Sequence, residues 1–206
     1  MEALENNNVN VQISEAILNG LYEISPSEMI AELQKKYSFD IKLIGNRMKV
    51  RQDVAPTFIK QAAGLYSHHY GCLSARGIII RSGRASFDYL LNHLDTLDAL
   101  TSSTYRLLPR PRRIKEGLEY LALLYSGWMN IQIMVSENGF MWVWSFQPGG
   151  TAADNECQPV IYYLLGLVQE FIYWAGGGRI YPITFREDPG QGLAGTLFEI
   201  CKKPLD

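Results

Sequence analysis

The stretch from Met129 to Phe146, MNIQIMVSENGFMWVWSF, decides the fold class, because its apolar residues repeat with the period of a β-strand. Met129, Ile131, Ile133 and Val135 alternate with Asn130, Gln132 and Met134. Asn138-Gly139 then predicts a tight hairpin, since both central positions of such a turn favour residues that tolerate a positive φ. The returning strand places four large rings on one face: Phe140, Trp142, Trp144 and Phe146.

The sequence after this hairpin predicts a helix and two more strands. Residues 159–174 are apolar almost all round, which is typical of a helix buried on more than one side. Gly176-Gly177-Gly178 ends this helix. Strands are expected over 179–186 and 195–202, and Pro182 places the first of them at a sheet edge. The C-terminal half therefore reads strand-strand-helix-strand-strand.

Apolar residues at helical spacing dominate the N-terminal half. Residues 1–12 lack periodicity and are expected to form a flexible tail, and 40–52 are expected to be extended or a ragged hairpin. Pro109 and Pro111 make 95–112 a connector. Helices are expected over 14–24, 27–37, 54–68, around 87–94 and over 114–125. We therefore predict an α+β fold, with helices packed on a four-stranded antiparallel sheet in one domain over 13–206.

Composition excludes several classes of function. The chain has 206 residues and a net charge of −2, so it lacks the basic footprint expected for binding nucleic acid. It has no apolar run of about 18 residues and no signal peptide, which predicts a cytoplasmic protein, either free or peripheral at a membrane. Cys72, Cys157 and Cys201 are too far apart for a CxxC metal clip, so reduced thiols and no bound metal are expected.

The sequence contains no constellation that supports catalysis. It lacks a dinucleotide-binding or Walker loop, a GxSxG motif and an HExxH motif, so an enzyme is not expected. Its three histidines, His68, His69 and His93, fit exposed or helix-end positions better than metal or haem ligation.

The aromatic stripe of the hairpin allows two interpretations. It is either the core face of the sheet or, together with a helix carrying Tyr163, Leu167 and Phe171, the wall of a slot for a flat apolar ligand.

A basic segment between residues 106 and 115 also allows two interpretations. Arg106, Arg110 and Arg112 lie either in a solvated loop or at a pocket mouth that binds carboxylates. An acidic partner protein or an anionic lipid would also fit. Combined with the stripe, the mouth interpretation suggests a tetrapyrrole, with its apolar plane inside and its propionates at the rim.

Three C-terminal segments, VIYYLLGLVQEFIYWAG, GRIYPITFRED and GLAGTLFEICKKP, resemble the closing half of the four-vinyl-reductase domain family. Gly166 matches the glycine of the family's buried helix, and Phe198-Glu199-Ile200 match its last strand. The resemblance implies a module that binds a hydrophobic ligand or a partner, is often dimeric and is not a reductase. Its fold relatives are TRAPP subunits of Golgi transport and, more distantly, haem-binding nitric-oxide/oxygen sensors. The family's metal-binding cysteines are replaced here by Ile161, Asp188 and Thr196.

The sequence therefore predicts a non-catalytic binding or carrier protein for a bulky hydrophobic ligand, with a tetrapyrrole (bilin, haem or chlorophyll precursor) favoured. The resemblance to cyanobacterial members of the family implies photosystem assembly as the setting, with membrane-protein assembly factors as partners. The alternative is a protein-interaction adaptor without a small-molecule ligand. A homodimer is expected, because four apolar residues of the N-terminal helices lack an obvious cover: Ile17, Leu21, Ile30 and Leu33.

Overall fold

The computed structural model describes residues 2–37, 41–44, 47–50, 56–129, 131–147, 158–187 and 195–205. Its contacts divide the chain into two compact units. The helical unit comprises residues 1–99 and 158–167, and the sheet unit comprises residues 100–157 and 168–206. Helix α8 (Gln158–Ala175) contributes its first part to the helical unit and its second part to the sheet unit.

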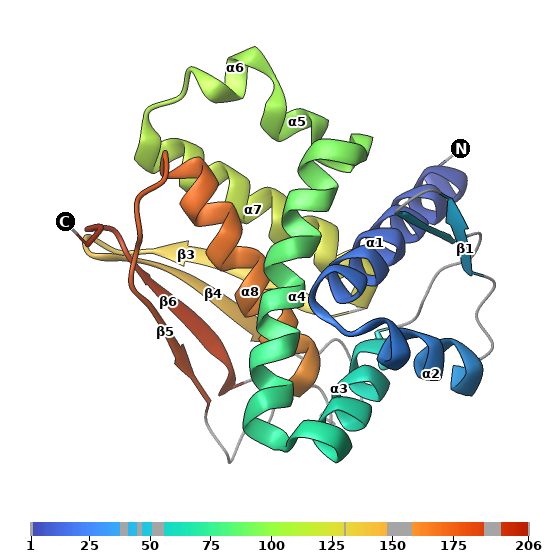
Figure 1. Cartoon of the computed structure of the whole chain (residues 1–206). Helices are drawn as coiled ribbons and strands as arrows, with labels where there is room; N and C mark the ends of the chain where they lie inside the picture. Colours follow the sequence, from blue (N-terminus) through green and yellow to red (C-terminus); the bar gives the residue numbers. More distant parts are fainter. Residues whose placement is uncertain are drawn as a thin grey trace. The chain divides into compact units, whose positions relative to one another are not determined.

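The helical unit is built around α4 (Cys72–His93), which packs against α1 (Glu2–Ile24) and α3 (Thr57–Tyr70) (Figure 1). Its other elements are α2 (Ser27–Tyr37), the hairpin β1 (Ile41–Ile44) and β2 (Arg47–Val50), and the short 3₁₀ helix η1 (Asp95–Leu97). Gly71 has a φ of 80°, which residues with a side chain rarely adopt, so the chain turns sharply between α3 and α4.

Small residues let the helices of this unit approach closely. A Cβ on Gly20 of α1 would collide with the carbonyl oxygen of Ser82 in α4. A Cβ on Gly166 of α8 would collide with the carbonyl oxygen of Ile80, and one on Gly83 with that of Tyr163. The backbones of α4 and the first part of α8 are therefore in direct contact, and no room is left between them.

Polar side chains join α1 to its neighbours inside the helical unit. The Asn19 side chain donates to the Met48 carbonyl and accepts from the Met48 N–H, both at 2.8 Å, and so pairs with β2 as a strand would. Glu15 is buried and accepts from Lys49 at 2.6 Å and from the Tyr89 hydroxyl at 2.9 Å. These bonds satisfy polar groups that would be costly to bury unpaired.

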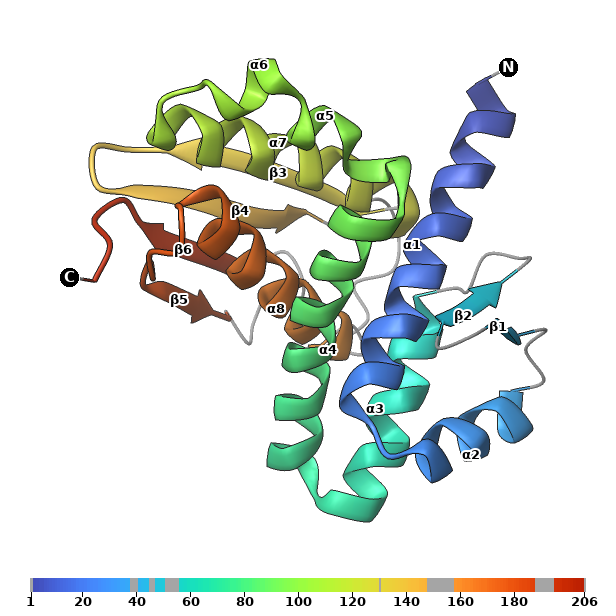
Figure 2. The ribbon, with the colours of Figure 1, turned by 45° about the horizontal axis from the view of Figure 1, so that its top comes forward.

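The sheet unit contains four antiparallel strands in the order β3-β4-β6-β5. The strands are β3 (Gln132–Glu137), β4 (Met141–Gln147), β5 (Ile183–Arg186) and β6 (Leu197–Cys201). The short helices α5 (Asp98–Thr101) and α6 (Ser103–Arg106) lead into α7 (Arg110–Met129), which packs on β3 and β4 (Figure 2). The predicted α+β fold with helices on a four-stranded antiparallel sheet is confirmed, as is the edge position of the strand after Pro182.

Several element boundaries differ from those predicted. Residues 2–12 are helical and extend α1, whereas the sequence predicts a flexible tail there. The expected connector over 95–112 contains η1, α5, α6 and the start of α7. The helix expected around 87–94 begins much earlier, because α4 runs continuously from Cys72 to His93. The division into two compact units does not test whether residues 13–206 behave as a single domain, so that expectation stays a prediction.

The β3–β4 turn also differs from the predicted one. Gly139 is not among the described glycines with a positive φ. Instead, the Asn138 side chain accepts hydrogen bonds from the N–H groups of Phe140 and Met141, both at 2.8 Å. An asparagine side chain therefore stabilises the turn by replacing a backbone acceptor.

The structure also bears on two further expectations, one about membrane-spanning helices and one about a homodimer. None of the described helices is both long and apolar enough to cross a membrane. The four residues proposed to need a dimer partner, Ile17, Leu21, Ile30 and Leu33, are all at most 5% exposed within one chain. The reason given for a homodimer is therefore wrong, because this chain itself covers those side chains.

Candidate functional site

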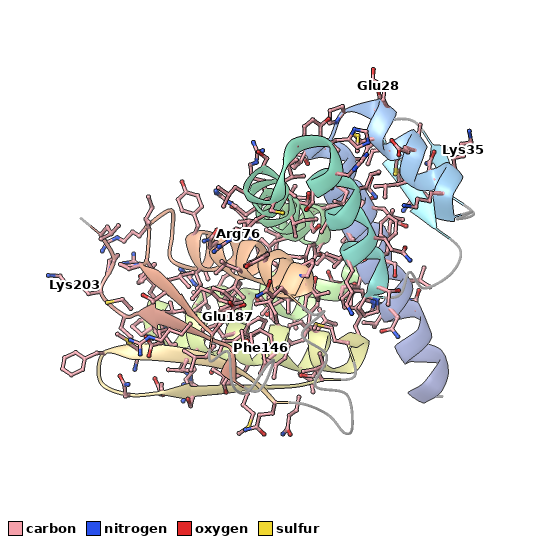
Figure 3. The ribbon with its side chains drawn as sticks, turned by 90° about the horizontal axis from the view of Figure 1, so that it is seen from below. Glu28, Lys35, Arg76, Phe146, Glu187 and Lys203 are labelled. Carbon is pink, nitrogen blue, oxygen red and sulfur yellow. The ribbon has the colours of Figure 1, made fainter. Side chains whose placement is uncertain are left out.

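The aromatic stripe of β4 lies in the core of the sheet unit. Trp142, Trp144 and Phe146 are each at most 1% exposed, and Phe146 is labelled in Figure 3. The Trp144 ring centroid lies 5.8 Å from those of Phe146 and Phe198, and the Phe146 and Phe198 centroids are 5.3 Å apart. The indole N–H of Trp144 donates to the Leu118 carbonyl of α7 at 3.2 Å. These rings fill the space beneath α7 by packing on one another.

Phe140 does not belong to the stripe. It lies in the turn before β4 and is 80% exposed. The prediction that four rings share one buried face is therefore wrong for this residue, because β4 begins one residue later, at Met141.

The three α8 residues of the predicted site are buried but belong to different units. Tyr163 and Leu167 lie in the helical unit, where their backbone atoms face Gly83 of α4. Phe171 lies in the sheet unit, where its ring packs so closely on Gly117 of α7 that a Cβ there would collide with it. The structure brings Phe171 into the same unit as the stripe.

Two arginines of the basic segment, Arg110 and Arg113, lie at the C-terminal end of α8, where carbonyl groups without helical partners favour cations. Arg113 donates to the Ala175 carbonyl from Nε at 2.8 Å and from one terminal nitrogen at 2.6 Å. Its other terminal nitrogen donates to the Arg106 carbonyl at 3.2 Å. Arg106 itself is exposed, and the Arg112 side chain pairs with Glu116 at 2.7 Å.

Arg110 differs from its neighbours. Its Nε is buried and lacks a hydrogen-bond partner among the described residues. Its side chain reaches the turn at Gly177, which ends α8. A buried guanidinium nitrogen without an acceptor is costly, so this atom is suited to an acceptor from outside the chain.

An open cavity of about 500 Å³ lies beside this segment, with both signs of charge in its lining. Glu137 lies there and accepts from Lys115 at 2.6 Å and from Lys202 at 2.7 Å. The hydrogen bond from Lys115, followed by that from Lys202, lowers the pKa of Glu137 to about 2. Because Glu116 and Glu119 line the same cavity, it is not the purely basic mouth that the sequence predicts.

Comparisons with known proteins show which solved structures share this fold. No family model matches the chain, and no curated protein matches it in sequence. Among solved structures, the chain is similar to an H-NOX domain from a study of haem distortion, with a TM-score of 0.64, 11% identity and coverage of 96% of this chain and 97% of that one. An oxygen-binding H-NOX domain related to soluble guanylate cyclases has a TM-score of 0.58, 11% identity and coverage of 96% and 97%. A variant of the T. tengcongensis H-NOX domain has a TM-score of 0.59, 11% identity and coverage of 92% and 96%.

These comparisons correct the family assignment. The similar structures are H-NOX domains and not four-vinyl-reductase or TRAPP proteins, so the resemblance proposed from the C-terminal segments is wrong. That resemblance rested on a pattern of glycine and aromatic positions, such as Gly166 and Phe198, and on few obligatory residues. At 11% identity, the likeness to H-NOX domains establishes the fold of this chain.

The residues present do not fit a haem held by an axial histidine. All three histidines are exposed. His69 pairs with Glu32 at 3.3 Å, and the His93 ring packs edge-on against Tyr89 at 4.9 Å. An axial imidazole must face the iron from an apolar wall, which none of these does. Among the described residues, no three histidine, cysteine or acidic side chains gather as a metal site would require.

Sequence reasoning missed a second set of residues. Arg76 and Tyr162 lie 86 positions apart, yet the Arg76 guanidinium carbon is 4.4 Å from the centre of the Tyr162 ring. No local pattern signals this pairing, because the fold alone brings α4 and α8 together.

Proposed function

We propose that this chain is a non-catalytic binding or carrier domain for a bulky apolar ligand with carboxylate groups, a tetrapyrrole being the favoured class. The main support is the likeness in fold to H-NOX domains over at least 92% of this chain. One of those domains is an oxygen-binding protein, and another was solved in a study of haem. Since no histidine here fits as an axial ligand, the proposed ligand is bound through its ring and its acids, without a bond from iron to histidine.

Arg110 supplies the residue-level support. Its buried Nε has no acceptor among the described residues, and a ligand propionate would provide one. Arg106 and Arg112 are proposed to add positive charge at the same rim. Phe140, Trp142, Trp144, Phe146 and Phe171 are proposed as apolar contacts, and all of them belong to the sheet unit. Because the Trp and Phe rings pack on one another, binding requires this cluster to open.

The test is a titration of the full chain with metal-free protoporphyrin, biliverdin and haem, followed by quenching of tryptophan emission. Alanine in place of Trp142 or Trp144 is a poor probe, because these buried residues stabilise the core. Arg110→Gln is the better variant, and Arg112→Gln is its matched control. We expect Arg110→Gln to weaken binding about tenfold and Arg112→Gln to weaken it less than threefold, about the difference between a buried and an exposed charged contact.

Failure of all three compounds to quench the emission would refute the ligand proposal. If the Arg110→Gln and Arg112→Gln variants bound with equal affinity, the ligand proposal would stand, but Arg110 would not be the residue that anchors the ligand.

The filled stripe favours one alternative, a protein-interaction adaptor with no small-molecule ligand. The partner would then be a second copy of this chain or a membrane-protein assembly factor. Two copies would have to pair through a surface other than Ile17, Leu21, Ile30 and Leu33. Light scattering at micromolar concentration distinguishes the monomer from the dimer. A cytoplasmic location stays a prediction. Photosystem assembly is not part of the proposal, since it rested on the family resemblance that the comparisons overturn.

A further inference from the structure

A groove of about 310 Å³ opens on the surface of the helical unit, between the end of α3, the start of α4 and the start of α8. The described residues that line it all belong to this one unit. Its floor is apolar and well packed, with Ala63 9%, Ala75 2% and Ile79 1% exposed. The volume is at the lower end of the range for ligand pockets, about 300–1,000 Å³, so it suits a single apolar chain better than a macrocycle.

The groove also has a cationic rim. Among the described residues that line the groove, Arg76 is the one charged side chain and none is acidic. Its guanidinium group lies over the Tyr162 ring at 4.4 Å, an arrangement that holds the cation at the edge of the apolar floor. Figure 3 labels Arg76 on α4. The first turn of α8 reaches the same groove and carries no acidic residue, so its helix dipole adds to the attraction for an anion.

The groove mouth is exposed and apolar. Leu73 is 86% exposed although it lies beside the apolar floor, and the Cys72 thiol next to it is exposed. Covering Leu73 would remove its apolar surface from water, which is favourable. A molecule lying along the floor with its head at Arg76 would cover both side chains.

We propose that this groove binds a single-chain amphiphile with an anionic carboxylate head, such as a medium-chain fatty acid. The alkyl chain lies on Ala63, Ala75 and Ile79, and the carboxylate pairs with Arg76. The inference does not rest on the proposed tetrapyrrole function, because it concerns another unit of the chain and another chemical class.

Cys72 supplies a direct readout, because an occupied groove shields its thiol. The experiment measures the rate of alkylation of Cys72 by iodoacetamide in the full chain, resolved by peptide mass spectrometry. Dodecanoate is added below its micelle concentration. At about ten times its dissociation constant, dodecanoate should slow the reaction at Cys72 about tenfold. Cys201, a half-buried cysteine outside the groove, should react at an unchanged rate and so reports that the fold is intact.

Three controls separate the parts of the proposal. Dodecyltrimethylammonium has the same tail and the opposite charge, and should not protect Cys72. Arg76→Gln should weaken dodecanoate binding about five- to tenfold, whereas Arg81→Gln, an exposed arginine of the same helix outside the groove, should leave it unchanged. Ser67→Leu fills the groove from α3 and should abolish protection.

Two results would overturn the inference. The first is an unchanged rate at Cys72 together with no retention of labelled dodecanoate in equilibrium dialysis. The second is equal affinity of the Arg76→Gln and Arg81→Gln variants, or equal protection by the cationic amphiphile, because the groove would then have no preference for an anion. Neither result depends on whether the chain binds a tetrapyrrole.

Discussion

Single glycines determine how closely the helices of the helical unit approach. Gly166 and Gly77 are both helical, yet their surroundings are opposite. A Cβ on Gly166 would collide with the Ile80 carbonyl oxygen, whereas a Cβ on Gly77 would have nothing within 4 Å. The same substitution therefore has opposite effects at the two sites, since alanine favours a helix only where there is room for its methyl group.

We predict that Gly166→Ala destabilises the protein by about 3 kcal/mol, because backbone atoms of α4 must move away. Gly77→Ala should instead stabilise it by about 0.5–1 kcal/mol, through its higher helix propensity. Urea denaturation of the two variants measures both values. A Gly166→Ala variant as stable as the wild type would mean that α4 and α8 are not in backbone contact.

Glu137 is the residue whose charge state should matter at low pH. The hydrogen bonds from Lys115 and Lys202 lower its pKa from the ordinary 4.5 to about 2. The folded state therefore binds the proton less readily than the unfolded state, so these ion pairs stabilise the protein above pH 4.5. The stabilisation is lost as the pH falls from there towards 2.

The prediction for this residue is that Glu137→Gln lowers the urea midpoint near pH 6 and that the difference from the wild type shrinks towards pH 2.5. The measurement is a series of urea titrations across this range. In a Lys115→Met, Lys202→Met background the carboxylate has lost both partners, so Glu137→Gln should have little effect at any pH. A pH-independent difference in the wild-type background would contradict the assigned pKa shift.

The C-terminal end of α8 shows how one element depends on another. Arg113 of α7 donates two hydrogen bonds to the Ala175 carbonyl in the last turn of α8. Arg112, its neighbour, is exposed and pairs within its own helix. Two adjacent arginines thus have different roles, one joining two helices and one lying on the surface.

Arg113→Met should cost about 1–2 kcal/mol in the free energy of unfolding, since it leaves helix-terminal carbonyls without a donor. Arg112→Met should cost less than about 0.5 kcal/mol, the usual contribution of an exposed pair one helical turn apart. Hydrogen exchange would show faster exchange in the last turn of α8 for the first variant alone. Equal exchange in both variants would argue against the capping role.

An element could be predicted from the sequence where the residues that determine it lie close together along the chain. The strand pairs around residues 138–140 and the helix over 27–37 follow from patterns within a few residues, and the structure confirms them. Residues 2–12 were expected to form a tail, but Gln12 bonds Thr96, which lies 84 positions away. The role of Arg113 likewise depends on Ala175, 62 positions away. Contacts of this range leave no trace in hydrophobic periodicity.

At the scale of the whole molecule, the two compact units share one helix but differ in the spectroscopic signals that they give. Helix α8 runs without a break through both units, with residues 158–167 in one and 168–175 in the other. All four tryptophans, Trp128, Trp142, Trp144 and Trp174, belong to the sheet unit. Tryptophan emission therefore reports on the sheet unit, whereas most of the helices that dominate far-ultraviolet circular dichroism belong to the helical unit.

We predict that the two units unfold together, because α8 cannot lose half of its hydrogen-bonded turns without weakening the other half. Asn19→Ala perturbs the helical unit alone, since it leaves the Met48 N–H and carbonyl without the partner they have in the wild type. This change should cost about 2–3 kcal/mol. It should lower the urea midpoints of circular dichroism and of tryptophan emission equally, and Asn92→Ala, at an exposed position of α4, should shift neither. If the tryptophan midpoint stayed at its wild-type value while the dichroism midpoint fell, the units would unfold independently and the prediction of a single domain would be wrong.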